Sequence, residues 1–410
     1  MSDINVTIPG GKAKRLKTAG KYCEQDILVT AEKPMPLTEK EVNFYDFDGT
    51  LLYAYTIEEA QALTELPPAP TPKKDFLVFD EWNWTLADIK AYNNSLQVGA
   101  TYKTVDGKTY AVIKIDEDWQ KNVTLRYAQW CSSVVVDWGD GTTEDPTTTG
   151  SGASVTKTHT YAEKGTYIIK VDADGVWNFG LNSSSGVFFG SANNNESIAL
   201  RELYVGNGAR LLGYAFLKAR GLEVVMIPKT ATQTWSDAFN WCASLRAVIL
   251  PSTFTLISAR SFTYCFSLRV ISFSKTITKI DSAGVTDTEC RVLTLPTASI
   301  TSSEKNYRLQ KLVIPEGVTQ MYISQTYCLE EVTLPSSITT IPANTFYFCY
   351  SLRRLRFKST TPPTVQNANA FTEVPTTCVV EVPAESLEAY QNATNYASIA
   401  AQMVGVSSFD

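Results

Sequence analysis

The segment LEVVMIP at residues 222–228 decides the fold, because its pattern recurs along the second half of the chain. The pattern is a Leu, two residues, an apolar residue, one residue, a second apolar residue and usually a Pro. Successive copies end 19 to 23 residues apart, and this period predicts a solenoid with one short strand in each turn. The further copies are LRAVILP at 245–251, LRVISFS at 268–274, CRVLTLP at 290–296, LQKLVIP at 309–315, LEEVTLP at 329–335, LRRLRFK at 352–358 and a weaker LRELYVG at 200–206.

Alternation within each copy explains why the copies should stack. The last two apolar residues are two positions apart, so they lie on one face of a strand. One short strand cannot bury that face alone, whereas strands from successive copies can pair edge to edge over a common core. The Pro that follows has no amide hydrogen and ends the pairing. Five copies carry it, at Pro228, Pro251, Pro296, Pro315 and Pro335.

The segments that lead back to the next strand carry aromatic residues and often a Cys. They read FNWCASL at 239–245, FTYCFSL at 262–268 and FYFCYSL at 346–352. Strands and returns together resemble the BspA-type leucine-rich repeats of bacterial surface proteins. The stretch 357–400 resembles that family's closing cap, with a Pro-Pro turn, a V-x-V-P strand and an S-L-x-A-Y helix. The resemblance covers about residues 198–405 and implies a leucine-rich-repeat solenoid.

Five of the eight Cys residues lie inside the repeats, where they predict buried free thiols. Cys242, Cys265 and Cys349 each stand three residues before a repeat Leu, so they should share one column of the solenoid. A small apolar side chain fits there, and buried Cys behaves as one. The others are Cys290 and Cys328. The chain has no C-x-x-C pair, so a zinc site is not expected.

A second β region precedes the repeats, at 122–144 and 155–173. VVVDW runs into the turn W-G-D-G, whose glycines permit positive φ, and THTY and GTYIIKV read as strands. Residues 108–175 resemble the polycystic-kidney-disease (PKD) domain, which implies an immunoglobulin-like sandwich that acts as a spacer or lies next to carbohydrate. Asp137, Asp140 and His159 could form a catalytic or calcium cluster, but Asp-Gly is a turn dipeptide and His159 lies in a strand pair, which favours a turn.

The first hundred residues predict smaller units. Residues 4–32 contain two short alternating strands around a Gly-rich connection and resemble N-terminal segments of phage tail and head proteins. Residues 41–56 predict a β-hairpin with Asp-Gly at its turn, followed by a short helix and the stiff linker PPAPTPKK. Thr85 is the expected N-cap of a further helix. The run from the hairpin to WNWTLADIK resembles a segment that precedes PKD and leucine-rich repeats in phage and prophage proteins of gut bacteria.

The sequence of the predicted hairpin also allows an alternative interpretation. DFDGT at 46–50 matches the first motif of haloacid-dehalogenase phosphatases, in which the first Asp is the nucleophile and the second a general acid beside Mg²⁺. The matching residues are Asp46 and Asp48. That chemistry needs a doubly wound α/β domain, whereas a Pro-rich linker and β regions follow here, so the hairpin is favoured.

Composition narrows the function further. The net charge is −6, 19% of the residues are charged and no run of five basic residues occurs, so nucleic-acid binding is not expected. A single His, and the absence of a P-loop, G-x-S-x-G or G-x-G-x-x-G motif, predict a non-enzymatic protein with no cofactor and no metal. No apolar stretch long enough for an export signal or a membrane span is found, so we expect cytoplasmic assembly and no membrane association.

The candidate ligand-binding surface lies on the returns of the solenoid. Aromatic residues exposed on stacked turns can form a sugar-binding face. The alternative is that they pack in the solenoid interior, and this interpretation is favoured for any one of them and for most of them together. The candidates are Trp235, Trp241, Tyr264, Tyr327 and Tyr350.

Together these features predict a mainly β modular protein. Its expected role is that of a phage virion component, as tail fibre, receptor-binding protein, capsid decoration or head fibre, present in multiple copies or as a homo-oligomer. The N-terminal region would contact other virion proteins, and the repeats would bind a host surface glycan or surface protein. The alternative is a bacterial cell-surface adhesin or host-interaction protein. The expected segments are an anchor (1–40), a hairpin, helix and linker (41–72), a small subdomain (73–107), the sandwich (108–175), the solenoid (176–360) and a cap (361–410).

Overall fold

The computed structural model describes most of the chain from residue 40 onward. The expected anchor at 1–40 therefore lies outside the described residues, apart from Lys40. The described residues are 40–144, 152–181, 188–190, 198–211, 213–281, 283–295, 299–300, 304–305, 308–319, 321, 323–324 and 326–409.

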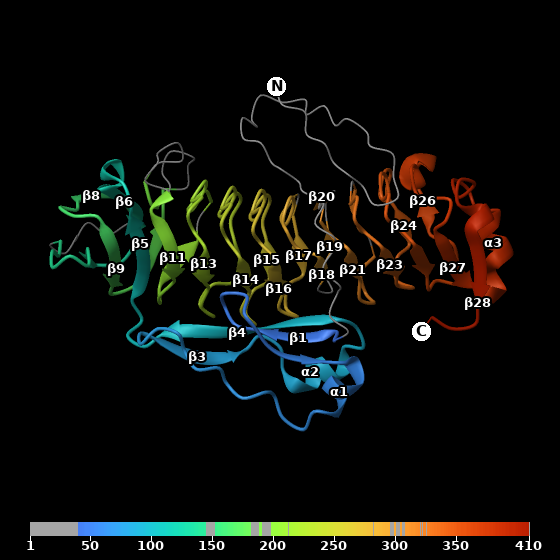
Figure 1. The fold of residues 1–410 in the computed structure, drawn as a ribbon, viewed down its shortest axis with the longest axis horizontal. Helices are drawn as coiled ribbons and strands as arrows, with labels where there is room; N and C mark the ends of the chain where they lie inside the picture. The colour runs from blue at the N-terminus through green and yellow to red at the C-terminus, as the bar shows by residue number, and fades with distance from the viewer. Residues whose placement is uncertain are drawn as a thin grey trace.

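The predicted solenoid is confirmed, and the described part of the chain is mainly β (Figure 1). Each copy of the repeated pattern forms a short strand. From β11 to β16 and again from β18 to β28, each strand pairs in parallel with the next. The strands are β11 (Leu200–Tyr204), β13 (Val224–Met226), β14 (Ala247–Ile249), β16 (Val270–Ser272), β18 (Val292–Thr294), β21 (Lys311–Val313), β23 (Glu331–Leu334), β25 (Arg354–Phe357), β27 (Val379–Pro383) and β28 (Met403–Val406).

The opposite side of the solenoid has shorter strands and the C-terminal end has a helical cap. The predicted cap helix is α3 (Leu387–Gln391), accompanied by the 3-10 helices η3 (Ala368–Phe371), η4 (Ala384–Ser386) and η5 (Ala400–Gln402). The short strands are β15 (Leu256–Ile257), β17 (Lys279–Ile280), β19 (Ser299–Ile300), β20 (Glu304–Lys305), β22 (Ile323–Ser324), β24 (Thr340–Ile341) and β26 (Thr364–Val365).

Identical residues stack in columns inside the solenoid. The rings of Phe216, Phe239 and Phe262 lie parallel, with centroids 5.3 and 5.5 Å apart. The predicted cysteine column is confirmed, because Cys242 and Cys265 are fully buried and each donates a 3.3 Å hydrogen bond to a carbonyl of the preceding turn. Repetition therefore places the same small or aromatic side chain at the same depth in successive turns.

The returns contain two columns of non-glycine residues in the left-handed conformation. One column includes Tyr214 and Asp237, and the other, four positions later, includes Trp241 and Tyr264 with φ of 64° and 60°. Such a backbone costs about 1 kcal/mol or more per non-glycine residue and is therefore uncommon. The chain turns sharply at these positions, where Tyr214, Trp241 and Tyr264 are half-buried and Asp237 is buried.

The second β region forms two facing sheets. One contains β5 (Thr109–Ile115), β9 (Gly165–Ala173) and β7 (Val134–Asp137), and the other β8 (Ala153–Thr160), β6 (Asn122–Gln129), β10 (Trp177–Phe179) and β12 (Ala209–Leu211). β5 also pairs with β11, so the first sheet continues into the strand sheet of the solenoid. One hydrophobic core runs through both, and the sandwich closes the N-terminal end of the solenoid. The 3-10 helix η1 (Asp118–Gln120) lies between β5 and β6.

Residues 40–104, here called the N-terminal module, form a small α/β unit. Its sheet has the order β2-β1-β4-β3 and carries two short helices. The predicted hairpin is confirmed, with Gly49 at φ 87°, and so is the N-cap at Thr85, whose side chain accepts a hydrogen bond from the Asp88 amide. The elements are β1 (Val42–Tyr45), β2 (Leu51–Tyr55), α1 (Ile57–Ala62), β3 (Leu77–Trp82), α2 (Leu86–Ala91) and β4 (Leu96–Thr104).

Candidate binding surface

The N-terminal module covers the first half of the outer strand face of the solenoid (Figure 1). Outward-pointing side chains such as Met226 and Ile249 are apolar and buried beneath it. Gly99 on β4 lies so close to Ile249 that a Cβ at this position would overlap that side chain. This half of the strand face is therefore occupied by the chain itself and is not available to a ligand.

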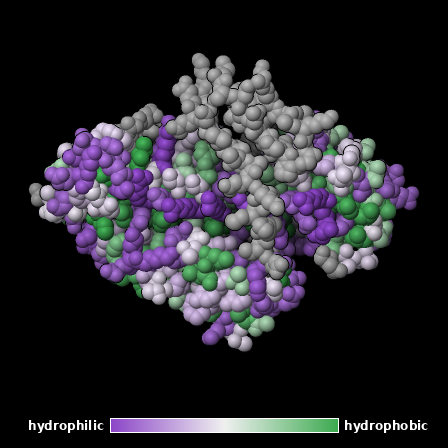
Figure 2. All heavy atoms as spheres, viewed as in Figure 1, coloured by the Kyte–Doolittle hydropathy of each residue, from purple (hydrophilic) through white to green (hydrophobic). Residues whose placement is uncertain are grey.

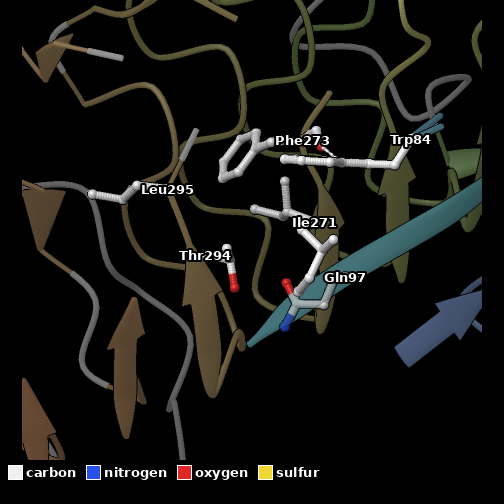
Figure 3. A pocket seen from close by; sticks show the side chains of 7 residues that line it. Trp84, Gln97, Ile271, Phe273, Thr294 and Leu295 are labelled. Carbon is white, nitrogen blue, oxygen red and sulfur yellow. Dashed lines mark hydrogen bonds between the residues drawn. The ribbon is translucent and has the colours of Figure 1, made fainter. Parts of the chain in front are cut away.

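Polar contacts fix the module on the strand face. The Asn83 amide donates to the Leu250 carbonyl and to Ser272 Oγ, both at 2.9 Å, and Trp84 Nε1 donates to the Phe273 carbonyl at 2.7 Å. A narrow crevice remains beside them, lined by Trp84, Gln97 and the Phe273 side chain among others (Figure 3), but it is too small for a water molecule. The crevice is thus a small gap in the packing between the N-terminal module and the solenoid.

The second half of the strand face carries paired charges. Arg354 lies 3.6 Å from Glu331 and 3.4 Å from Glu381, and Arg356 lies 2.7 Å from Glu381. These side chains occupy the positions that apolar residues occupy beneath the module. These charges therefore neutralise one another between neighbouring strands.

The five candidate aromatic residues lie on the outer side of the returns, and none is in the solenoid interior. Trp235 is 46% exposed, and the others are half-buried. The interior positions of the same returns are filled by the Phe and Cys columns. The structure brings Trp241 and Tyr264 together and, farther along, Tyr327 and Tyr350, whereas Trp235 joins neither pair.

The candidates belong to two larger groups. The first aromatic cluster comprises Trp241, Tyr264 and Phe266 together with Arg220, and the second comprises Tyr327, Tyr347, Phe348 and Tyr350. Sequence reasoning missed Arg220, Phe266, Tyr347 and Phe348. The available signal was their spacing, because Arg220 and Phe266 each stand two residues before a repeat Leu, as Tyr327 and Tyr350 do.

The rings of the first aromatic cluster contact one another at an angle, in tilted and edge-to-face pairs. The Arg220 guanidinium, from the preceding turn, lies 5.7 Å from the centre of the Trp241 ring, and the Tyr264 ring, from the following turn, lies 4.5 Å from it. Trp241 therefore contacts one residue of the turn before it and one residue of the turn after it.

The carboxylates of the DFDGT motif hold the hairpin to the linker. Asp46 is buried and accepts a 2.7 Å hydrogen bond from the Tyr102 hydroxyl, while Lys73 lies 3.0 Å from Asp46 and 2.5 Å from Asp48. Burial raises the pKa of Tyr102, and the bond to Asp46 raises it further. Lys73 directly follows the Pro-rich stretch, so its ion pairs with Asp46 and Asp48 hold the linker against the hairpin.

The predicted W-G-D-G turn is also confirmed in the sandwich. Gly139 and Gly141 have φ of 79° and 92°, and Asp140 lies 2.7 Å from His159, which stacks on Trp138. Burial alone would raise the pKa of Asp140, but hydrogen bonds from Thr142 and His159 outweigh it and lower that pKa to about 2. The Asp140–His159 pair thus stabilises the turn, and the turn is the interpretation that the sequence favours over a catalytic or calcium cluster.

The described residues show neither a metal site nor a membrane-spanning helix. They contain no group of three or more His, Cys, Asp or Glu side chains arranged to hold a metal ion, and none of their helices could span a membrane. Figure 2 shows hydrophilic residues over much of the sandwich and apolar residues scattered over the rest of the face in view. Scattered apolar residues are normal on a protein surface.

Comparisons with known proteins agree with the repeat assignment. Residues 199–307 and 318–400 match the BspA type leucine-rich repeat region in six copies, so this half of the chain is a BspA-type leucine-rich repeat region. A leucine-rich repeat protein from Bacteroides ovatus is similar over 50% of this chain and 66% of its own length, just under two thirds, with 16% identity and a TM-score of 0.30. A leucine rich cell surface protein from Faecalibacterium prausnitzii is similar over 50% of this chain and 86% of its own, with 14% identity and a TM-score of 0.19. None of the curated proteins matches the chain.

Proposed function

We propose that the protein is a non-enzymatic adhesin, displayed at a bacterial surface, that binds its ligand through the outer columns of the solenoid returns. The BspA-type repeat region supports display at a surface, because repeats of this type are those of bacterial surface proteins. This reading places the cell-surface alternative ahead of the virion. The ligand is a glycan or a surface protein of a bacterial cell.

One observation carries the binding role: half-exposed aromatic residues occupy left-handed backbone positions on the outer side of the returns, over which the described residues place no other module. The strand face is covered by the N-terminal module in its first half and carries paired charges in its second. Trp241 and Tyr264 cost backbone free energy and leave apolar area exposed to water. A bound ligand that covers this area would offset that cost.

The other parts of the chain have supporting roles in this proposal. The sandwich, whose two sheets fit the PKD resemblance, acts as a spacer that is continuous with the repeats. The N-terminal module stiffens the solenoid by bridging several of its strands. Many copies on one surface would multiply weak contacts, because avidity rises with the number of linked sites.

The phage virion is the second candidate, and the observation that favours it is the resemblance of residues 41–90 to segments of phage proteins. Peptide mass spectrometry on the cell-envelope fraction and on gradient-purified particles of the producing culture separates the two. Recovery in the envelope supports the cell-surface adhesin. Stoichiometric recovery with capsid or tail proteins contradicts it and supports the virion.

The binding role itself is tested by adhesion of fluorescently labelled protein to intact gut bacteria. Retention on cells that falls when Trp241 is replaced, with the fold preserved, supports binding through the outer columns. Retention that is unchanged contradicts it.

A further inference from the structure

We propose that the exposed face of Trp130 binds the flat apolar face of a neutral pyranose sugar in a polysaccharide. Trp130 directly follows β6 at one end of the sandwich, so this site is separate from the outer columns of the solenoid. The inference goes beyond the proposed function, because it assigns a second binding site to a part of the chain that otherwise acts as a spacer.

Trp130 is the most exposed of the eight Trp residues. It is 58% exposed, compared with 47% for Trp119 and 46% for Trp235. The described residues place neither a hydrogen-bond acceptor on its Nε1 nor a ring or cation over it. A large apolar face and a free N–H are therefore both available to a ligand. Single exposed apolar residues are common on protein surfaces, but the Trp130 ring is also fixed in place by its neighbours.

Gly152 lies against one face of the Trp130 ring. A Cβ placed on Gly152 would be 2.6, 2.8 and 2.9 Å from Cζ2, Cη2 and Cε2, which are three adjacent ring atoms. These similar distances put that position over the face of the ring, because a position beyond the ring edge would be clearly closer to one atom than to its two neighbours. Gly152 also has a φ of 78°, which favours glycine. The glycine thus covers one face of the indole and leaves the exposed area on the opposite face and the edges.

Backbone hydrogen bonds fix both sides of this contact. The Trp130 amide donates to the Val176 carbonyl at 3.1 Å, and the Gly152 amide donates to the Gln129 carbonyl at 2.7 Å. These bonds join the ends of β6, β8 and β10 around the ring. A side chain that is held in place before binding loses less conformational freedom when a ligand binds, which favours the complex.

Hydrogen-bonding groups lie on the segment that follows Trp130. Ser132 Oγ donates to Asp174 Oδ2 at 2.5 Å, and the Ser133 amide donates to Asp174 Oδ1 at 2.9 Å. These bonds, above all the one from Ser132, lower the pKa of Asp174, which is therefore an anion at neutral pH. Asp174 is exposed, and a carboxylate has room to accept further hydrogen bonds, in this case from sugar hydroxyls. It repels an anionic ligand, so the sugar is expected to be neutral.

The chemistry of the sugar follows from the shape of the ring. A pyranose with equatorial hydroxyl groups carries C–H groups on its flat faces and hydroxyl groups around its rim. Its face can cover the apolar area of the indole while its rim forms hydrogen bonds with nearby polar groups. Neutral β-linked glucans consist of such sugars and are the ligand class proposed for Trp130.

Affinity gel electrophoresis of the full chain tests the site, because this method detects weak binding to a polysaccharide held in the gel. The probes are hydroxyethyl cellulose and laminarin, which are neutral β-glucans, and carboxymethyl cellulose, which is the charged relative of the first. At least one neutral glucan should retard the wild-type protein, and carboxymethyl cellulose should retard it less than hydroxyethyl cellulose does. Trp130→Ala should weaken binding about tenfold or more, as is common when a central Trp is removed. Gly152→Ala should also weaken binding, because its Cβ displaces the ring.

The chain offers two controls. Trp119→Ala removes a 47% exposed Trp that precedes β6, whereas Trp130 follows it. The double variant Trp241→Ala and Tyr264→Ala alters the outer columns. Both should bind the neutral glucan as the wild type does, and circular dichroism should show that all variants are folded.

Several results would overturn the inference. No retardation by either neutral glucan, equal retardation of the wild type and Trp130→Ala, or stronger retardation by carboxymethyl cellulose than by hydroxyethyl cellulose would each do so. Glucan binding that only the outer-column double variant loses would overturn it as well and would support the proposed function. Glucan binding through Trp130 in a protein that does not adhere to bacteria would leave the inference intact and contradict the proposed function alone.

Discussion

Asn83 and Ser272 are 189 residues apart in the chain, yet the Asn83 side-chain amide donates a 2.9 Å hydrogen bond to the Ser272 hydroxyl. The same hydroxyl donates to the Gln97 carbonyl at 2.7 Å, so one small polar residue in β16 holds two parts of the N-terminal module. Both residues are buried. This contact joins the module to the strand face of the solenoid, together with the apolar packing on Met226 and Ile249.

Docking of the module should depend on the close approach of Gly99 to Ile249. Gly99→Ala places a Cβ within the Ile249 side chain and should destabilise the docked module by about 1–3 kcal/mol. Hydrogen exchange of the module and of β14 should accelerate together. Gly165→Ala is the control, since its Cβ would meet nothing closer than the Tyr167 ring at 3.5 Å. Equal exchange in both variants would contradict the close contact.

Substitutions of Phe239 and Trp241 should have different effects, the first mainly on stability and the second mainly on binding. Phe239→Ala removes a fully buried ring from the interior column and should lower the free energy of unfolding by about 3–5 kcal/mol. Trp241→Ala removes a half-buried outer ring and should cost less stability but reduce adhesion. Urea denaturation and cell binding, measured on both variants, check the two effects. A reversed order of stabilities would show that the outer column is structural.

Acid should weaken the sandwich through Asp140. The pKa of this carboxyl is about 2 when folded, below its ordinary value of 3.8, so the folded state holds its proton less tightly than the unfolded state. Its stabilising effect is therefore complete above about pH 4 and is lost as the pH falls toward 2. We expect about 1 kcal/mol, reduced by solvent screening. Asp140→Asn should flatten the pH dependence of thermal unfolding in this range, and an unchanged profile would refute this role.

Alkylation should spare four of the five thiols of the repeats in the native protein, because the fifth, Cys328, is only partly buried and not fully buried as predicted. Burial raises the pKa of Cys242 and Cys265, and it raises the pKa values of Cys290 and Cys349 to about 12. The reactive thiolate is therefore scarce, and the reagent is excluded. Mass spectrometry after iodoacetamide treatment at pH 8 should find these four unmodified before denaturation and modified after it. Rapid labelling of the native protein would contradict their burial.

Asp46→Asn should act on stability and not on catalysis. It weakens the contacts of a buried carboxylate with Lys73 and Tyr102, which should cost about 1–3 kcal/mol. The wild-type protein should not hydrolyse p-nitrophenyl phosphate with Mg²⁺. Turnover that Asp46→Asn abolishes while the fold persists would restore the phosphatase reading.

Most of the solenoid could be predicted from the sequence, because each turn needs apolar residues at the same strand positions and small or aromatic residues at the same interior positions. The L-x-x-V-x-I pattern fixed the strands, and the Cys spacing placed Cys242 and Cys265 in one column. The contacts of Trp241 with Arg220 and Tyr264 of the neighbouring turns were not predicted, because they depend on which residues of adjacent returns meet. The docking of the N-terminal module on the solenoid was not predicted either, although the sequence contains one sign of it. Outward strand positions are apolar at Met226 and Ile249 but charged at Arg354 and Arg356, and successive apolar residues on an outward face indicate that another element covers it.

Adhesion of the labelled protein to intact gut bacteria tests the central claim most directly. Wild type should be compared with the double variant Trp241→Ala and Tyr264→Ala and with Trp119→Ala, which removes a 47% exposed Trp from the sandwich instead. Circular dichroism should confirm that all three are folded. If the outer columns bind the ligand, the double variant should lose most of its retention on cells and Trp119→Ala should keep it. Equal retention of all three proteins would contradict the account.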